Sequence, residues 1–201
     1  MLDARLRRLI DPPLDRLAGA LEGSRLNANA VTVVGFGIGL LAVVALAGQA
    51  FVAALVLILL NRLLDGLDGA LARRKGSSDL GGFLDITFDF IFYAAVPFGF
   101  ALADPATNGL AAAFLIFSFV GTGSSFLGFA VMAAKRRISS EIRGRKSIYY
   151  LGGLTEGSET IAAFVLACLL PSHFPLIALV FGVACWITTA TRIVAAWQVL
   201  R

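Results

Sequence analysis

Charged residues are scarce in this chain of 201 residues, at 15%, whereas hydrophobic residues make up 58%. Soluble globular domains average about 25% charged and about 45–50% apolar residues, so this composition excludes an ordinary soluble domain. Cysteine occurs only twice, and Cys168 and Cys185 both lie within apolar runs, which argues against a structural disulfide or a cysteine-based metal site. The low charge and the long apolar runs together predict an integral membrane protein.

Six apolar stretches are candidates for membrane-spanning helices. They cover roughly residues 31–48, 50–64, 84–103, 109–133, 153–170 and 175–197. Small faces on which helices can approach closely are offered by the glycine pairs Gly35/Gly39, Gly121/Gly123 and Gly153/Gly157. The sequence therefore predicts an all-α integral membrane bundle of six transmembrane helices, with residues 25–201 as one membrane domain.

Residues 1–24 carry leucines at helical spacing with arginines between them. Pro12 and Pro13 interrupt this pattern in its middle. A basic amphipathic segment of this kind is typical of a helix that lies in the membrane interface and does not cross the bilayer. We therefore expect an N-terminal interfacial helix; the alternative is a solvated helix that binds a protein partner.

All 17 Lys and Arg residues fall on one side of the predicted bundle. Six crossings put both termini on that side, and the basic residues lie before residue 26, at 62–75, at 135–146 and at 192–201. Cytoplasmic segments carry such an excess, so we expect a multi-pass protein of the inner (cell) membrane with both termini in the cytoplasm. Because the basic residues flank apolar runs, the net charge of +4 indicates contact with membrane lipids and not with nucleic acid.

Four aspartates stand out because charge is costly at membrane depth. Asp65 and Asp68 are three residues apart and Asp85 and Asp89 are four apart, so each pair shares one face of a helix. The two helices are consecutive and antiparallel, so all four carboxylates can converge near the cytoplasmic boundary. Their repulsion is offset well by Mg²⁺ or Mn²⁺, as two ions or as one ion with one acid left free as a base. The alternative is that these acids cap helices and pair with nearby arginines.

Two glycines, Gly66 and Gly69, flank these acids. Glycine within a helix costs about 1 kcal/mol relative to alanine, so this pair predicts a helix surface kept clear for a flat or phosphorylated ligand.

A cation transporter and a non-enzymatic scaffold are the competing classes of protein. A transport pathway needs acids through the depth of the bilayer, and the outer halves of the predicted spans lack charge; a scaffold has no use for four costly acids.

The spacing of these residues resembles the signature of the CDP-alcohol phosphotransferases, which are integral membrane enzymes of phospholipid synthesis. The matching residues are Asp65, Asp68, Gly69, Ala72, Arg73, Gly81, Asp85 and Asp89. Seven residues separate Arg73 from Gly81, where the family pattern usually has about eight. The resemblance implies transfer of a phosphate-bearing group from a CDP-linked donor to an acceptor alcohol, with release of CMP, by an enzyme that is usually a homodimer.

The resemblance also implies roles for particular residues of this chain. It makes Asp65, Asp68, Asp85 and Asp89 the ligands of two metal ions, and Asp89 the general base as well. The residues implied in binding the CDP group are Asn29, Ala30, Val31, Thr32, Gly69, Arg73 and Ser78.

The expected donor is CDP-diacylglycerol, because a reaction centre at the membrane surface lets an acyl tail stay in lipid; a soluble CDP-linked donor is the alternative. The acceptor is a small alcohol such as glycerol phosphate or inositol phosphate. Candidates for binding its phosphate are Arg143, Arg145, Lys146 and Arg192. The basic 135–146 segment equally fits an anchor for anionic lipid headgroups.

Overall fold

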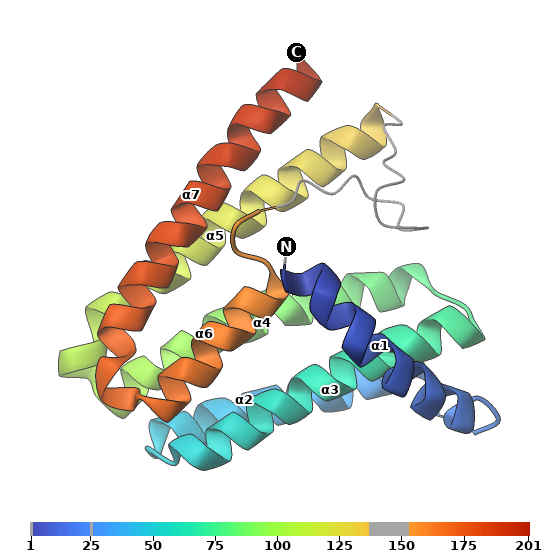
Figure 1. The fold of residues 1–201 in the computed structure, drawn as a ribbon, viewed down its shortest axis with the longest axis horizontal. Coiled ribbons are helices and arrows are strands. Elements are labelled where there is room, and N and C mark those ends of the chain that lie inside the picture. Colours follow the sequence, from blue (N-terminus) through green and yellow to red (C-terminus); the bar gives the residue numbers. More distant parts are fainter. Residues whose placement is uncertain (1, 25, 137–152) are drawn as a thin grey trace.

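The computed structural model describes residues 2–24, 26–136 and 153–201, and every regular element in these ranges is a helix (Figure 1). In chain order the elements are α1 (Leu2–Leu21), α2 (Ala28–Ala47), α3 (Phe51–Lys75), α4 (Asp79–Ala103), α5 (Pro105–Lys135), α6 (Gly157–Leu169), the short 3-10 helix η1 (Pro171–His173) and α7 (Phe174–Leu200). The expectation of an all-α fold is confirmed for this part of the chain.

Four of these helices are long and apolar enough to cross a membrane: α2, α4, α5, and η1 together with α7. The other two expected spans differ from this pattern for identifiable reasons. Helix α3 continues well past the apolar stretch into a charged end, and α6 has only 13 described residues. The structure therefore supports a membrane-integral bundle, and the count of six crossings stays a prediction.

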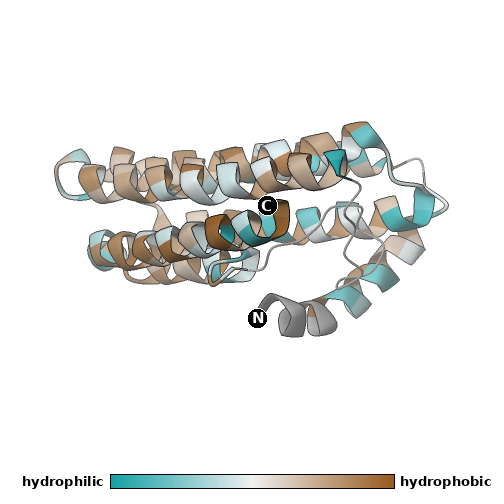
Figure 2. Ribbon diagram, turned by 90° about the horizontal axis from the view of Figure 1, so that it is seen from above, coloured by the Kyte–Doolittle hydropathy of each residue, from teal (hydrophilic) through white to brown (hydrophobic). Residues whose placement is uncertain are grey.

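The long helices pack in two groups, α2 with α3 and α4, and α5 with α4 and α7, and the two groups share an aromatic core. Helix α2 packs against both α3 and α4, whereas α5 packs against α4 and α7 (Figure 1). Where α4 meets the start of α7, the Phe100 and Phe174 rings stack with their centroids 4.3 Å apart. Apolar residues cover most of the length of the long helices (Figure 2), and many of them face outward, including Val52 and Leu110. Such extensive exposed apolar surface is typical of lipid contact.

Glycines permit the close helix contacts that the sequence predicts. A Cβ atom on Gly39 of α2 would lie 2.8 Å from the Phe92 ring of α4, and one on Gly123 of α5 would lie 2.8 Å from the Phe90 ring. Real Cβ atoms do not approach other atoms so closely, because interiors are already packed to van der Waals contact. Phe90 and Phe92 are two residues apart and so point to different sides of α4, which places α5 and α2 against different sides of that helix.

Helix α1 continues through Pro12 and Pro13, so the interruption expected there does not end the helix. Its Leu14 and Ala18 side chains are buried in a small apolar cluster with residues of α2 and α3. A Cβ atom on Gly66 would lie 2.6 Å from Leu14 Cδ1. The expectation that Gly66 keeps room for a ligand is therefore wrong, because that space belongs to Leu14.

The charged end of α3 also holds α1 and the segment after it. Arg74 Nη1 lies 3.1 Å from Glu22 Oε2. Lys75 Nζ donates hydrogen bonds of 2.9 Å to the backbone carbonyls of Ser24 and Leu26. Helix α1 is thus docked across the polar end of α3 (Figure 1).

Replacing Gly66 with Val tests this docking. The added methyl groups would occupy the space of Leu14, and overpacking typically costs about 1–3 kcal/mol. We expect hydrogen exchange of the α1 backbone amides to accelerate by about tenfold or more, and the second substitution Leu14→Ala to reverse part of that change. Gly69→Val is the matched control, since a Cβ there meets only Arg73 Nη1, at 3.5 Å. Unchanged α1 exchange in Gly66→Val would contradict the docking.

Candidate active site

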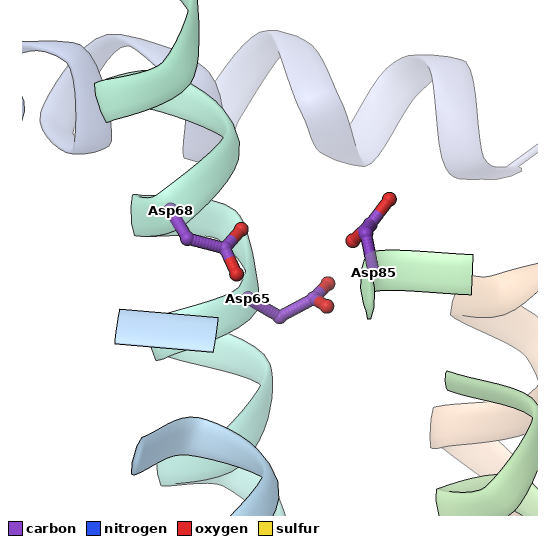
Figure 3. Close-up of side chains that lie close together, drawn as sticks. All are labelled: Asp65, Asp68 and Asp85. Atoms are coloured by element: carbon purple, nitrogen blue, oxygen red, sulfur yellow. The ribbon is translucent and has the colours of Figure 1, made fainter. Parts of the chain in front are cut away.

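Three carboxylates from two helices meet at the polar ends of α3 and α4. One carboxylate oxygen from each of Asp65, Asp68 and Asp85 lies within 4.8 Å of the others. Figure 3 shows the Asp65 and Asp68 side chains leaving α3 and the Asp85 side chain leaving α4, all directed toward the space between the helices. The three-residue spacing on α3 places two of them on one face, and the antiparallel course of α4 brings the third opposite.

One member of this cluster, Asp68, has an unsatisfied buried atom. Asp68 is 5% exposed, and its Oδ2 has no hydrogen-bond partner. An unpaired buried polar group costs about 1–3 kcal/mol, and more when it is charged. Two unit charges 4 Å apart repel by about 4 kcal/mol at the effective dielectric constant of a protein surface. A cation with oxygen preference, such as Mg²⁺ or Mn²⁺, offsets both costs, so the residues present fit a divalent metal ion.

The turn between α3 and α4 sets the register of the cluster. Only residues 76–78 connect the two helices, and Gly76 there has a φ of +104°, which favours glycine. Ser78 begins α4 as its N-cap and accepts a 3.1 Å hydrogen bond from the Gly81 amide. Asn29 of α2 is close by: a Cβ on Gly81 would lie 2.8 Å from its Oδ1. Gly81 therefore permits the starts of α2 and α4 to approach each other.

A pocket opens at the carboxylates, lined by residues of α2, α3 and α4. Its walls are formed by Thr32, Gly35, Phe36, Asn61, Arg62, Asp65, Asp68, Asp85, Phe88 and Asp89. Phe36 and Phe88 stack face to face, with ring centroids 4.2 Å apart. The aromatic pair and Asn61 were not predicted as site residues. Asn61 is buried and polar within an apolar stretch, which is the signal that could have identified it.

Asp89 lines the same pocket but is held differently from the other three aspartates. Its Oδ1 lies 2.8 Å from Nη1 of Arg62, and the same nitrogen lies 3.6 Å from Asp65 Oδ2. The sequence predicts four converging carboxylates, and all four line this pocket; the Asp65, Asp68 and Asp85 carboxylates lie within 4.8 Å of one another, and Asp89 pairs with Arg62. Arg62 precedes Asp65 by one helical turn, so it also faces the pocket.

Of the described residues implied in nucleotide binding, Thr32 alone is part of the pocket lining. Gly69 presents an open helix surface next to the Arg73 guanidinium. Arg73 Nη2 lies 3.4 Å from Asp15 Oδ1 of α1. The Val31 side chain packs in the apolar cluster under α1, and Ala30 is exposed.

The acceptor candidates separate into two groups. Arg143, Arg145 and Lys146 lie outside the described residues. Arg192 is buried on α7, where its Nη1 donates a 3.1 Å hydrogen bond to the Thr122 carbonyl of α5. The described residues that line the carboxylate pocket do not include Arg192.

Comparison with known proteins assigns this arrangement to a family. Residues 25–197 match the family model described as CDP-alcohol phosphatidyltransferase. The chain therefore belongs to the CDP-alcohol phosphatidyltransferase family and is an enzyme of the transferase class.

Two relatives match nearly the whole chain. The inner membrane protein YnjF of Escherichia coli (strain K12) is 54% identical over 201 residues, which is 100% of this chain and 98% of that protein. An archaetidylinositol phosphate synthase of Pyrococcus horikoshii is 30% identical over 194 residues, which is 96% of this chain and 95% of that protein.

Solved structures of one enzyme share the fold. The phosphatidylinositol phosphate synthase of Mycobacterium tuberculosis with CDP-DAG bound superposes with a TM-score of 0.71 at 22% identity, over 92% of this chain and 93% of that one. The same synthase in complex with manganese and citrate gives a TM-score of 0.65 at 22% identity, over 92% of this chain and 88% of that one.

Proposed function

We propose that the protein transfers a phosphatidyl group from CDP-diacylglycerol to a small alcohol and releases CMP, in a reaction that depends on Mg²⁺ or Mn²⁺. The observation that carries this proposal is the cluster of Asp65, Asp68 and Asp85, in which the buried Asp68 Oδ2 has no hydrogen-bond partner. Family membership supplies the reaction class, and the cluster supplies a place for the diphosphate's counter-ion.

Each part of the pocket has a task in this reaction. The carboxylates of Asp65, Asp68 and Asp85 hold the cation, which when bound neutralises the donor's diphosphate and the charge that develops on CMP. Gly69 leaves the α3 surface open, so the nucleotide can lie next to Arg73 and Thr32, with Asn29, Ala30, Val31 and Ser78 around it.

Asp89 is the proposed general base. It lines the pocket from α4, and a carboxylate there can take the proton of the acceptor hydroxyl as its oxygen attacks the phosphorus next to the diacylglycerol group. The new bond joins that oxygen to phosphorus, and the bond to the CMP oxygen breaks.

A lipid donor is supported by the position of the pocket. Asp65, Asp68 and Asp85 lie toward the polar ends of helices whose remaining length is apolar (Figure 2), so a nucleotide can bind while acyl chains stay in the bilayer. The fold relative from Mycobacterium tuberculosis binds CDP-DAG. A soluble CDP-linked donor is the alternative that the assay below distinguishes.

A phosphorylated polyol is the proposed acceptor. The relatives named as synthases of archaetidylinositol phosphate and phosphatidylinositol phosphate support inositol phosphate as the first compound to test, with glycerol phosphate beside it. The proposed ligands of its phosphate are Arg143, Arg145, Lys146 and Arg192.

We further propose a particular setting in the membrane. Six crossings by residues 25–201 put the pocket and both termini on the cytoplasmic side of the inner membrane, and residues 1–24 lie in the interface. The basic residues around the polar end of α3 support this orientation, and a homodimer is the expected assembly.

The purified protein in lipid nanodiscs should release CMP from CDP-diacylglycerol when Mg²⁺ or Mn²⁺ and the right alcohol are supplied. The screen compares inositol phosphate, glycerol phosphate, inositol, serine and choline. Asp89→Asn should lower the rate by about 100- to 10,000-fold, the usual contribution of a general base. Asp104→Asn, at the opposite end of α4, is the control and should keep full activity.

Two results would contradict this account. Unchanged CMP release by Asp89→Asn would remove its role as the base. Turnover of a soluble CDP-alcohol, with none of CDP-diacylglycerol, would replace the lipid donor by the soluble one.

The orientation is tested by placing single cysteines in two exposed connections. Ala106→Cys lies between α4 and α5 and Ser77→Cys lies between α3 and α4, while the native Cys168 and Cys185 are buried. A membrane-impermeant maleimide applied to intact cells should label Ala106→Cys and spare Ser77→Cys until the membrane is permeabilised. The reverse pattern would invert the proposed topology.

A further inference from the structure

The last turn of α3 carries three consecutive basic residues, and each of them contacts α1 or the segment that follows it. Arg73 Nη2 lies 3.4 Å from Asp15 Oδ1 of α1, and Arg74 Nη1 lies 3.1 Å from Glu22 Oε2. Lys75 Nζ donates hydrogen bonds to two backbone carbonyls between α1 and α2. Arg73 is the one of these three that is also implied in nucleotide binding, so its partner on α1 lies beside the proposed nucleotide site.

The backbone of Asp15 is held in place by its neighbour in the sequence. Leu14 is 5% exposed, and a Cβ atom on Gly66 of α3 would lie 2.6 Å from its Cδ1. Ala18, one helical turn later on the same face of α1, is fully buried. Because Asp15 directly follows Leu14, the packing of α1 on α3 fixes where its carboxylate can reach.

The Arg73 guanidinium lies between this carboxylate and the bare surface of α3. A Cβ atom on Gly69 would lie 3.5 Å from Arg73 Nη1, while Nη2 of the same planar group faces Asp15. Gly69 directly follows Asp68 of the carboxylate cluster. The guanidinium is therefore held next to the proposed position of the donor's diphosphate.

Two effects of Asp15 on nucleotide binding oppose each other. An arginine side chain has many rotamers, and fixing it before the ligand arrives lowers the entropy that binding must cost. The Asp15 carboxylate also carries a negative charge, which by itself repels a diphosphate. The ordering effect requires contact with Arg73, whereas the repulsion acts from any acid at a similar distance, so the two can be separated by experiment.

We propose that Asp15 is a positioning residue of the nucleotide site, which holds the Arg73 guanidinium over the Gly69 surface before the diphosphate of the CDP-linked donor binds. This inference rests on the proposed function, because it assumes that the nucleotide lies next to Gly69 and Arg73. It gives α1 a part in substrate binding, in addition to its proposed place in the membrane interface (Figure 1).

Binding of CDP to the protein in nanodiscs, measured by isothermal titration calorimetry at saturating Mn²⁺, tests the proposal. Asp15→Asn should weaken CDP binding by about two- to fivefold, the usual coupling of exposed ion pairs, since the Arg73 and Asp15 side chains are 56% and 48% exposed. Asp15→Glu keeps the carboxylate and should bind CDP as the wild type does. Asp11→Asn is the matched control: it removes the same charge one helical turn earlier on α1 and should not weaken CDP binding.

Two further measurements separate positioning of Arg73 from docking of α1. Hydrogen exchange of the α1 backbone amides should be the same in Asp15→Asn and in the wild type, because Leu14 stays packed against Gly66. In an Arg73→Gln background, Asp15→Asn should leave the dissociation constant of CDP unchanged, because no guanidinium remains to be positioned.

Four results would overturn the role of Asp15. They are equal or tighter CDP binding by Asp15→Asn, an equal loss in Asp11→Asn, a further loss in the Arg73→Gln background, and weaker binding accompanied by faster α1 exchange. Failure of the proposed function looks different, because the wild type itself would then bind no CDP. A wild type that binds CDP, with Asp15→Asn unchanged, would overturn this inference alone.

Discussion

Negative charge gathered between α3 and α4 is the constraint on which the site depends. Four aspartates line one pocket in a chain that is otherwise strongly apolar, and such charges are stable only with compensation. The protein supplies part of that compensation itself, by fixing Arg62 against Asp89 and close to Asp65. The charge at Asp68 is left without it, and its buried Oδ2 has no hydrogen-bond partner. The proposed binding of a cation rests on that imbalance.

The rest of the fold serves to hold these charges in register. Glycines on α2 let α3 and α4 approach it closely: a Cβ on Gly35 would lie 3.1 Å from Leu64 Cβ, and one on Gly39 would meet Phe92. The same stretch of α2 accepts the hydrogen bond that orients Asn61 and, through it, Arg62. Helix α1 packs Leu14 against Gly66, between the two aspartates of α3. Packing and charge placement are therefore parts of one arrangement.

Much of this arrangement could be predicted from the sequence, because it follows from local periodicity. Long apolar runs gave the positions of α2, α4, α5 and α7, and the spacing of the aspartates placed Asp65, Asp68 and Asp85 on facing helices. The remainder depends on tertiary contacts that no local pattern encodes. The rotation of α4 about its axis decides that Asp89 meets Arg62. The docking of α1 decides that Gly66 accommodates Leu14 and not a ligand. Helix α1 itself continues through Pro12 and Pro13, although proline is disfavoured inside a helix.

The most direct test of the central claim is anomalous X-ray scattering from crystals of the protein soaked in Mn²⁺. The account predicts an anomalous peak among the Asp65, Asp68 and Asp85 carboxylates, and its loss in Asp68→Asn crystals of unchanged fold. A wild-type map with no peak among these three side chains, or a peak that persists undiminished in Asp68→Asn, would contradict it.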